Sequence, residues 1–300
     1  MRFVATVLLV LTSGLVLAAC TTPPADMSHP LQADLAMLMQ AGDSVTVAIS
    51  VIDPSTQTEF HINGDRLFHA ASTMKVPVMI EVFRQADLGR FDMSDEIVLR
   101  NEFRSIVDGS TFSIGDDSDD ASYEKLGQPM SMADLTYNMI IVSSNLATNL
   151  LIDELSADSV QATSERLGTT NMQTLRGVED LKAFDLGLSN RTTSKDLAIL
   201  MAHIMNGTAV SRTADAGMRQ ILLDQQFGDM IPANLPEGVE VAHKTGSITR
   251  INHDAAIVYP PDAAPYVLVI LTEGLDHHSE SAALGARIAA RVHEVLRGAS

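Results

Sequence analysis

Strand periods mark both ends of the chain, where hydrophobic residues alternate with polar or small ones. The first such stretch, Val45–Val51, is followed by a turn at Asp53–Ser55 and a second extended stretch at Glu59–Ile62, so we predict a β-hairpin. Strand signals return near the C-terminus. Three further strands are predicted there, at Val239–Thr245, Ala255–Tyr259 and Tyr266–Thr272.

Between these strands the apolar residues recur with the period of a helix. Ser131 is placed to cap one helix, and Gly42 ends a first helix that begins at Leu31. The segment from Arg176 to Arg191 shows no clear period and holds two glycines, so we predict a long surface loop. Further helices are predicted around Leu146–Leu155 and Leu197–Ile204, and from Ser279 to Val295.

The order of these elements predicts the fold class. Strands at both ends with helices between them favour an α/β protein of the α+β kind, in which an antiparallel sheet is flanked by N- and C-terminal helices and carries an inserted all-α lobe. We expect residues 31–300 to form this domain, with an α/β lobe from 31–71 and 227–300 and a helical lobe from 72–226. A chain of 300 residues with 46% hydrophobic content can bury a large core. A cleft is expected where the lobes meet.

Residues 1–19 have the pattern of a secretion signal, in which a basic residue precedes an uncharged apolar stretch, Val4–Leu17. A membrane-spanning helix is the alternative, but the stretch is short for one. Leu17–Cys20 resembles the bacterial lipobox, whose cysteine becomes the lipidated first residue of the mature protein. We therefore expect a lipoprotein that is exported and anchored in the membrane of the cell envelope by Cys20, facing the periplasm or the exterior, with residues 20–30 as a tether. Cys20 is the only cysteine, so no intramolecular disulfide can form.

The formal net charge of −18 argues against nucleic acid and anionic membrane surfaces as partners. Acidic residues are densest at Asp116–Asp120, which we interpret as a solvated loop; calcium binding is the alternative, but the glycine and closing glutamate of an EF-hand loop are missing. The histidines show no paired ligand spacing, and His203 and His243 are interpreted as structural residues. We expect no metal, no cofactor and a monomer.

A serine and a lysine, Ser72 and Lys75, stand three positions apart at the predicted start of a helix. Proline is tolerated in the first turn of a helix and disruptive further in, so Pro77 places the helix start just upstream. The Lys75 amine can then reach the Ser72 hydroxyl on the same helical face. The S-x-x-K spacing occurs by chance about once in a chain of this length. A second copy, Ser122–Lys125, lies in the acidic stretch, where we predict a solvated loop.

Two further motifs follow along the chain. Ser143–Asn145 lies at a break between two apolar helical runs, and His243–Ser247 contains K-T-G at the end of a predicted strand. Taken singly, Ser143 and its neighbour are explained equally by helix caps, and Lys244 by a surface position on a strand edge. In this order the motifs S-x-x-K, S-x-N and K-T-G resemble those of the penicillin-recognising serine enzymes, most closely the class A β-lactamases. The resemblance extends from around Leu31 to the C-terminus.

The resemblance implies a catalytic role for several of these residues. Ser72 is the acylated nucleophile, and Lys75 takes its proton as a neutral amine, which requires a lysine pKa well below the ordinary value of about 10.4. Ser143 relays a proton to the leaving nitrogen. Asn149 braces the long loop. Substrate binding is assigned to Asn145, which binds the substrate amide, to Lys244 and Thr245, which hold the substrate carboxylate, and to Gly246 and Ser247, the N–H group of Ser247 forming the oxyanion hole with that of Ser72.

Three positions depart from the class A pattern. Ser144 stands where those enzymes usually carry Asp, so it can accept a hydrogen bond but supplies no negative charge. The position of the deacylating glutamate holds Val178, and Glu179 follows one residue later as the candidate catalytic base. Arg191 replaces the acidic residue that closes the loop neck against Arg176, so the neck must be held in another way.

Three functions fit this sequence. The first is a serine hydrolase that opens the β-lactam amide through an acyl-serine intermediate. The second is a related enzyme that acts on peptidoglycan peptides or small esters. The third is a penicillin-trapping lipoprotein that is acylated and deacylates slowly.

Overall fold

The computed structural model describes residues 31, 34–35, 37, 39 and 45–298. The predicted signal segment, the tether and Cys20 lie outside these residues. Leu31 and Leu35, from the predicted first helix, are helical and fully buried. Within the described part of the chain, no helix is long and apolar enough to cross a membrane.

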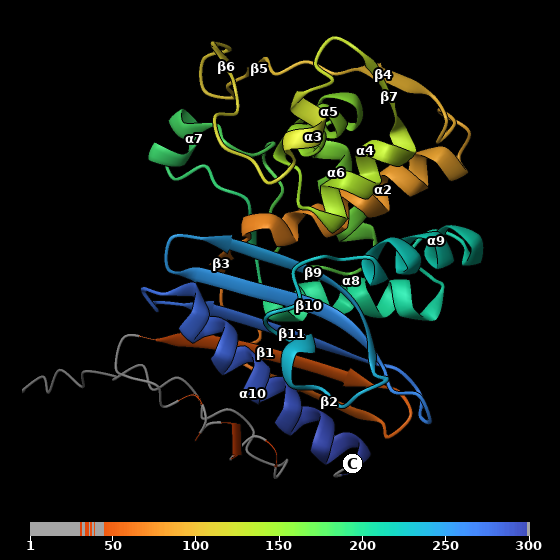
Figure 1. Ribbon diagram of the computed structural model, residues 1–300, viewed down its shortest axis with the longest axis vertical. Helices are drawn as coiled ribbons and strands as arrows, with labels where there is room; N and C mark the ends of the chain where they lie inside the picture. The colour runs from red at the N-terminus through yellow and green to blue at the C-terminus, as the bar shows by residue number, and fades with distance from the viewer. Residues whose placement is uncertain (1–30, 32–33, 36, 38, 40–44, 299–300) are drawn as a thin grey trace, which may run out of the picture.

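An antiparallel sheet of five strands forms the centre of the fold. Its strands are β1 (Thr46–Asp53), β2 (Thr58–Ile62), β9 (Glu240–Ile248), β10 (Ile251–Tyr259) and β11 (Tyr266–Glu273). Their order across the sheet is β2-β1-β11-β10-β9 (Figure 1), with Ile49 of β1 opposite Ile270 of β11. The sheet therefore joins the two ends of the chain, as the strand periods predict.

Helices cover both faces of this sheet (Figure 1). Successive residues of β11 point to opposite faces, so Leu268 packs in the cluster under α10 (His278–Arg297), whereas Val269 packs in the cluster on the other side. On that other side lie α8 (Ser194–Asn206) and α9 (Arg212–Leu223). Although α8 falls in the range predicted for the helical lobe, it packs directly against β1, β10 and β11.

The helical lobe lies beyond these helices. Its central helix, α2 (Lys75–Asp87), is buried along most of its length. Ser131 caps the next long helix by accepting a hydrogen bond from the Asp134 N–H, as predicted. The other helices of the lobe are α3 (Asp120–Tyr123), α4 (Met132–Ile141), α5 (Asn145–Leu155), α6 (Ala157–Arg166) and α7 (Leu181–Asp185).

The remaining elements are short. Two of them are 3₁₀ turns, η1 (Ala71–Met74) and η2 (Pro232–Asn234). The others are three two-stranded ribbons that pair β3 (Phe68–His69) with β8 (Arg191–Thr192), β4 (Glu96–Val98) with β7 (Pro129–Ser131), and β5 (Phe103–Arg104) with β6 (Thr111–Phe112).

Two segments predicted as plain loops differ from that prediction. The long loop between Arg176 and Arg191 contains the short helix α7. The acidic stretch leads into α3, and Ser122 of the second S-x-x-K copy is buried there rather than solvated. The carboxylates of the acidic stretch accept hydrogen bonds from backbone and side-chain donors. These bonds hold the acidic residues in the fold.

Candidate active site

Ser72 lies in η1, directly before α2, on a turn that is fixed from both sides. The preceding residue, Ala71, has a φ of +45°, which is unfavourable for a residue with a Cβ. Its N–H group donates to Nδ1 of His69 at 3.0 Å. On the other side, the hydroxyl of Thr73 donates to the carbonyl oxygen of Ala70 at 2.6 Å. These contacts hold the serine at a defined angle in front of the helix.

Lys75 is fully buried behind this turn. Its Nζ donates to the carbonyl oxygen and the Oγ of Ser143, at 2.6 and 3.1 Å, and to Oδ1 of Asn145 at 2.8 Å. Burial lowers the pKa of Lys75 to about 7, because the charged form loses its hydration, while the carboxylates of Asp117 and Glu179 act in the opposite direction. A lysine in this state can exist as the neutral amine at neutral pH.

The second motif breaks the chain between α4 and α5. Ser144 is buried and caps α5, since its Oγ accepts the N–H of Ala147 at 3.1 Å. Ser143 is not a cap: its φ is +58°, and its Oγ lies 3.1 Å from the Nζ atoms of both Lys75 and Lys244. The helix-cap alternative therefore holds for Ser144 only. The hydroxyl of Ser143 joins two buried amines and can pass a proton between them.

Lys244 is fully buried on β9, so the alternative of a surface lysine is wrong. Its Nζ donates to Oγ of Ser143 and to the carbonyl oxygen of Thr245 at 2.8 Å. Burial and the charge of Lys75 hold the pKa of Lys244 well below its ordinary value, and Asp254 acts against them. The charge of Lys75 therefore disfavours the charged form of Lys244.

Gly246 brings β9 against the turn of the nucleophile. A Cβ at this position would lie 2.8 Å from the backbone nitrogens of Ser72 and Thr73, closer than real side chains approach. Glycine is therefore needed for this close approach. The next residue, Ser247, lines the same cavity as Ser72. This approach places the edge of the strand beside the N–H group of Ser72, where an oxyanion hole is expected.

The neck of the long loop is closed by an amide rather than by an ion pair. Asn190 accepts the N–H groups of Leu175 and Arg176 with its Oδ1, at 2.8 and 3.2 Å, and donates to the carbonyl oxygen of Arg176 at 2.8 Å. The buried Arg176 guanidinium donates to the carbonyl oxygen of Leu188 at 2.8 Å. Arg191 is exposed. Hydrogen bonds to backbone groups inside the loop therefore take the place of the missing ion pair.

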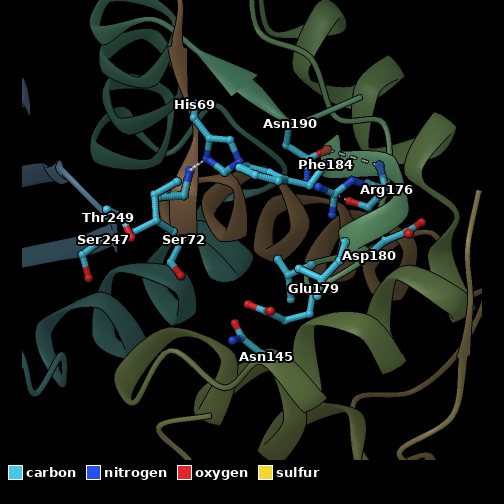
Figure 2. A pocket seen from close by; sticks show the side chains of 14 residues that line it. His69, Ser72, Asn145, Arg176, Glu179, Asp180, Phe184, Asn190, Ser247 and Thr249 are labelled. Atoms are coloured by element: carbon cyan, nitrogen blue, oxygen red, sulfur yellow. Dashed lines mark hydrogen bonds between the residues drawn. The ribbon is translucent and has the colours of Figure 1, made fainter. Parts of the chain in front are cut away.

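Glu179 reaches the cavity because its backbone is left-handed. Asn149 braces the preceding residue, accepting the N–H of Val178 at 2.6 Å and donating to its carbonyl oxygen at 3.0 Å. Glu179 then has a φ of +63°, which reorients its side chain relative to an ordinary loop residue. Figure 2 shows its carboxylate turned toward Asn145, on the side of the cavity where Ser72 lies. Glu179 therefore lines the cavity although it follows the expected glutamate position by one residue.

Two cavities meet at the predicted nucleophile. The first, of about 300 Å³, lies between the long loop and the end of β9, and the second, of about 350 Å³, lies on the other side of Ser72. Ser72, Asn145 and Ser247 line both. The first is also lined by Glu179, Asp180 and Phe184, so it has apolar and acidic lining residues.

His203 and His243 make hydrogen bonds within the fold. His243 is buried with its Nδ1 2.9 Å from Oδ1 of Asp254, and His203 lies 3.0 Å from the carbonyl oxygen of Leu167. Both therefore make structural hydrogen bonds, as predicted. Among the residues that the structure describes, no group of three or more His, Cys, Asp or Glu side chains is placed to hold a metal ion.

Three residues near the site were missed by the sequence interpretation. Asp117 accepts backbone N–H groups of the second motif, although we interpreted its acidic stretch as solvated. Asn190 closes the loop neck, and His69 supports the turn before Ser72. For Asp117, the density of acidic residues was the one sequence feature that pointed to a special role. Asn190 and His69 are single residues outside any motif, so the sequence does not mark them.

The predicted site residues on the three motifs and on the long loop are brought together at this one place, and Cys20 lies outside the described residues. The sequence matches the model of the β-lactamase enzyme family over residues 30–296. Among curated proteins, it is 24% identical over 289 residues to a β-lactamase of Rhodobacter capsulatus, covering 93% of this chain and 94% of that protein. It is 26% identical over 242 residues to a β-lactamase of Bacillus amyloliquefaciens, covering 78% of this chain and 74% of that protein.

Solved structures agree with this assignment. The β-lactamase of Sphaerobacter thermophilus superposes with a TM-score of 0.77 at 29% identity, covering 90% of this chain and 97% of that chain. PBP-A has the same fold: its structure superposes with a TM-score of 0.78 at 24% identity, covering 90% of this chain and 96% of that chain. A fold of this kind, the S-x-x-K, S-x-N and K-T-G motifs in one cleft, and the match over nearly the whole chain lead to one conclusion. The chain belongs to the β-lactamase enzyme family and is a serine hydrolase of the β-lactamase type.

Proposed function

We propose that this protein hydrolyses β-lactams to completion, through an acyl-enzyme on Ser72 that Glu179 helps to release. One observation carries the proposal: the carboxylate of Glu179 and the nucleophile Ser72 line the same cavity, and Figure 2 shows that carboxylate turned toward Asn145. A base is useful for deacylation only if it can reach the water beside the ester. The position of Glu179 in the cavity of Ser72 supports this role.

Acylation begins with Lys75. With a pKa of about 7, a substantial fraction of its amine is neutral at neutral pH and can take the proton of the Ser72 hydroxyl. The serine oxygen attacks the lactam carbonyl, and the resulting oxyanion is bound by the N–H groups of Ser72 and Ser247. The lactam C–N bond then breaks. The proton held by Lys75 passes to the leaving nitrogen through the hydroxyl of Ser143, which lies within hydrogen-bond distance of this lysine.

Deacylation uses the other wall of the cavity. A water molecule between Glu179 and the ester gives its proton to the carboxylate, and its oxygen attacks the ester carbonyl. The bond between the acyl group and Ser72 breaks, and the serine oxygen takes the proton that Glu179 received from the water, which restores the carboxylate. Lys244 and Thr245 hold the carboxylate of the substrate during both steps, which places the lactam carbonyl at the oxyanion hole.

The test compares Glu179→Gln with the parent protein. The amide cannot take a proton, so the turnover of a chromogenic cephalosporin should fall by about 10² to 10⁴, the usual contribution of a general base, while acylation stays fast. Asp185→Asn is the matched control, because it removes the same charge from the same loop at an exposed position that does not line the cavity. It should leave turnover unchanged.

Two outcomes would replace this proposal. If the parent protein is acylated but releases no product, a penicillin trap describes it better. If it releases product at the same rate with Gln at position 179, another group activates the water, and the substrate class must be tested again with peptidoglycan peptides and small esters.

We also propose that the protein is an exported lipoprotein, on the basis of the Leu17–Cys20 sequence. One acyl chain binds a membrane only marginally, whereas the several chains of a bacterial lipoprotein hold it firmly. Cys20→Ser should therefore move the protein from the membrane fraction to the soluble fraction of the cells that produce it. Equal membrane association of the variant and the parent would contradict this proposal.

A further inference from the structure

The loop between β6 and α3 reaches the helix break of the second motif. Both carboxylate oxygens of Asp117 lie 2.9 Å from the backbone nitrogen of Asn145, and Oδ2 also accepts the N–H of Leu146 at 2.9 Å. The next residue, Ser118, donates its hydroxyl to the carbonyl oxygen of Val142. Two successive loop residues thus hold the chain on either side of Ser143.

Asp117 completes the N-terminus of α5. The first four N–H groups of a helix have no partner within the helix. The N–H of Ser144 itself donates to the carbonyl oxygen of Asn138 at 3.1 Å, and the Oγ of Ser144 accepts the N–H of Ala147. The remaining two belong to the first two residues of the helix, and Asp117 accepts both. The positive end of a helix favours an anion, and Ser144 is neutral, so the negative charge at this helix start is supplied by Asp117.

Asn145 connects this helix start to the catalytic lysine. Its backbone N–H is held by Asp117, and its side-chain Oδ1 accepts from Nζ of Lys75 at 2.8 Å. We propose that Asp117 is a positioning residue for acylation: its carboxylate fixes the first residue of α5 and thereby sets how Asn145 presents its amide to Lys75 and to the substrate. This inference rests on the proposed acylation of Ser72.

Asp117 also affects Lys75 through its negative charge, in addition to its effect on the position of Asn145. Three charged groups surround Lys75: Asp117 on this loop, Glu179 on the long loop and Lys244 on β9. Asp117 in turn accepts a hydrogen bond from the Tyr123 hydroxyl of α3 at 3.1 Å. The two carboxylates raise the pKa of Lys75, whereas its burial lowers it. Removal of the Asp117 charge should therefore lower the lysine pKa further and leave more of the neutral amine at acidic pH.

The experiment measures the acylation rate of Ser72 by a fluorescent penicillin between pH 5 and pH 9, together with the melting temperature. Asp117→Asn keeps the shape of the side chain and removes its charge. We expect the acid limb of the rate profile to move to lower pH by about one unit, the lower end of the effect of a nearby opposite charge. The plateau rate should fall by about ten-fold, because Asn145 is held less firmly.

Asp116→Asn is the control, since it removes the same charge from an exposed neighbour in the same loop. It should change neither the acid limb nor the plateau. Asp117→Glu keeps the charge but lengthens the side chain, so it should keep the acid limb of the parent and lower the plateau. This second variant also serves if Asp117→Asn does not fold.

The outcomes separate this inference from the proposed function. An acid limb of Asp117→Asn that coincides with that of the parent, with a lower melting temperature as the only change, would reduce Asp117 to a structural residue and overturn the inference. An Asp117→Glu protein that is acylated at the rate of the parent would overturn it too. A parent protein that is not acylated at any pH would instead refute the proposed function.

Discussion

The chain contains the S-x-x-K spacing twice, and the two copies differ in everything except that spacing. Ser72 stands on a 3₁₀ turn beside two cavities, and Lys75 is fully buried with three hydrogen bonds to the second motif. In the other copy, the Ser122 hydroxyl is buried and donates to Asp119, while Lys125 is exposed after the end of α3.

This difference shows what makes a serine and a lysine reactive. The burial of the lysine lowers its pKa, and only a lysine with a lowered pKa can accept a proton at neutral pH. The serine must also face a cavity that can hold a substrate. A buried serine bonded to a carboxylate and followed by a solvated lysine meets neither condition. The spacing alone therefore has no catalytic meaning.

The largest expected effect is the loss of covalent labelling when the Ser72 hydroxyl is removed, compared with removal of the Ser122 hydroxyl. Ser72→Ala should abolish covalent labelling by a fluorescent penicillin, because the proposed mechanism forms the acyl bond on the oxygen of this serine. Ser122→Ala should leave the labelling unchanged. Labelling that survives in the first variant, or is lost in a folded second one, would break the comparison.

The next effect concerns the two lysines. Lys75→Met keeps most of the volume and removes the base, so the acylation rate should fall by about 10² to 10⁴. Lys125→Met should change nothing. Stopped-flow measurement of acylation at pH 8 compares the two variants directly, and a slow Lys125→Met protein would show that the exposed lysine matters.

The same lysine variant has an effect on the free energy of unfolding whose size depends on pH. The pKa of Lys75 in the folded state is lowered to about 7, so below that pH the folded and unfolded states both carry the proton. The buried charge then reduces the free energy of unfolding by its full amount. As the pH rises from about 7 toward the ordinary lysine pKa, the folded protein gains up to roughly 4 kcal/mol from this group. Lys75→Met should therefore stabilise the protein most near pH 6 and least near pH 10. Urea unfolding at the two values tests this, and a constant difference would contradict it.

The smallest effect is a loss of stability at the second copy. Ser122→Ala removes the hydroxyl that donates to the buried Asp119, so the free energy of unfolding should fall by about 1 to 2 kcal/mol. Ser110→Ala is the control, because its hydroxyl donates to an exposed carboxylate, that of Asp108. It should cost less than about 0.5 kcal/mol. Equal losses in both variants would mean that burial does not distinguish the two serine–aspartate pairs.

Much of the fold could be predicted from the sequence, because the periods of the apolar residues are clear. The alternation at Val45–Val51 predicted β1, and the polar residue Ser131 marked the start of α4. The order of the three motifs was enough to predict a shared cleft. These signals are local or depend on sequence order, so they remain visible in the sequence.

Other features depend on contacts or backbone angles that the sequence does not display. The orientation of Glu179 follows from a φ of +63°, and a glutamate gives no sign that it will adopt this conformation. Asp117 contacts Asn145 across 28 positions of the chain, and Asn190 replaces an ion pair by hydrogen bonds to backbone groups. In each case the determining partner is distant in sequence or is a peptide group without side-chain identity.

The central claim is that Ser72 forms an acyl-enzyme which Glu179 helps to hydrolyse. Mass spectrometry of the parent and of Glu179→Gln, quenched at successive times after mixing with a limited amount of a penicillin, tests it most directly. In the parent, the mass of the ligand should appear on the peptide that contains Ser72 and disappear as the ligand is consumed, whereas in the variant it should persist. An adduct on another peptide, or one that decays at the same rate in both proteins, would contradict the account.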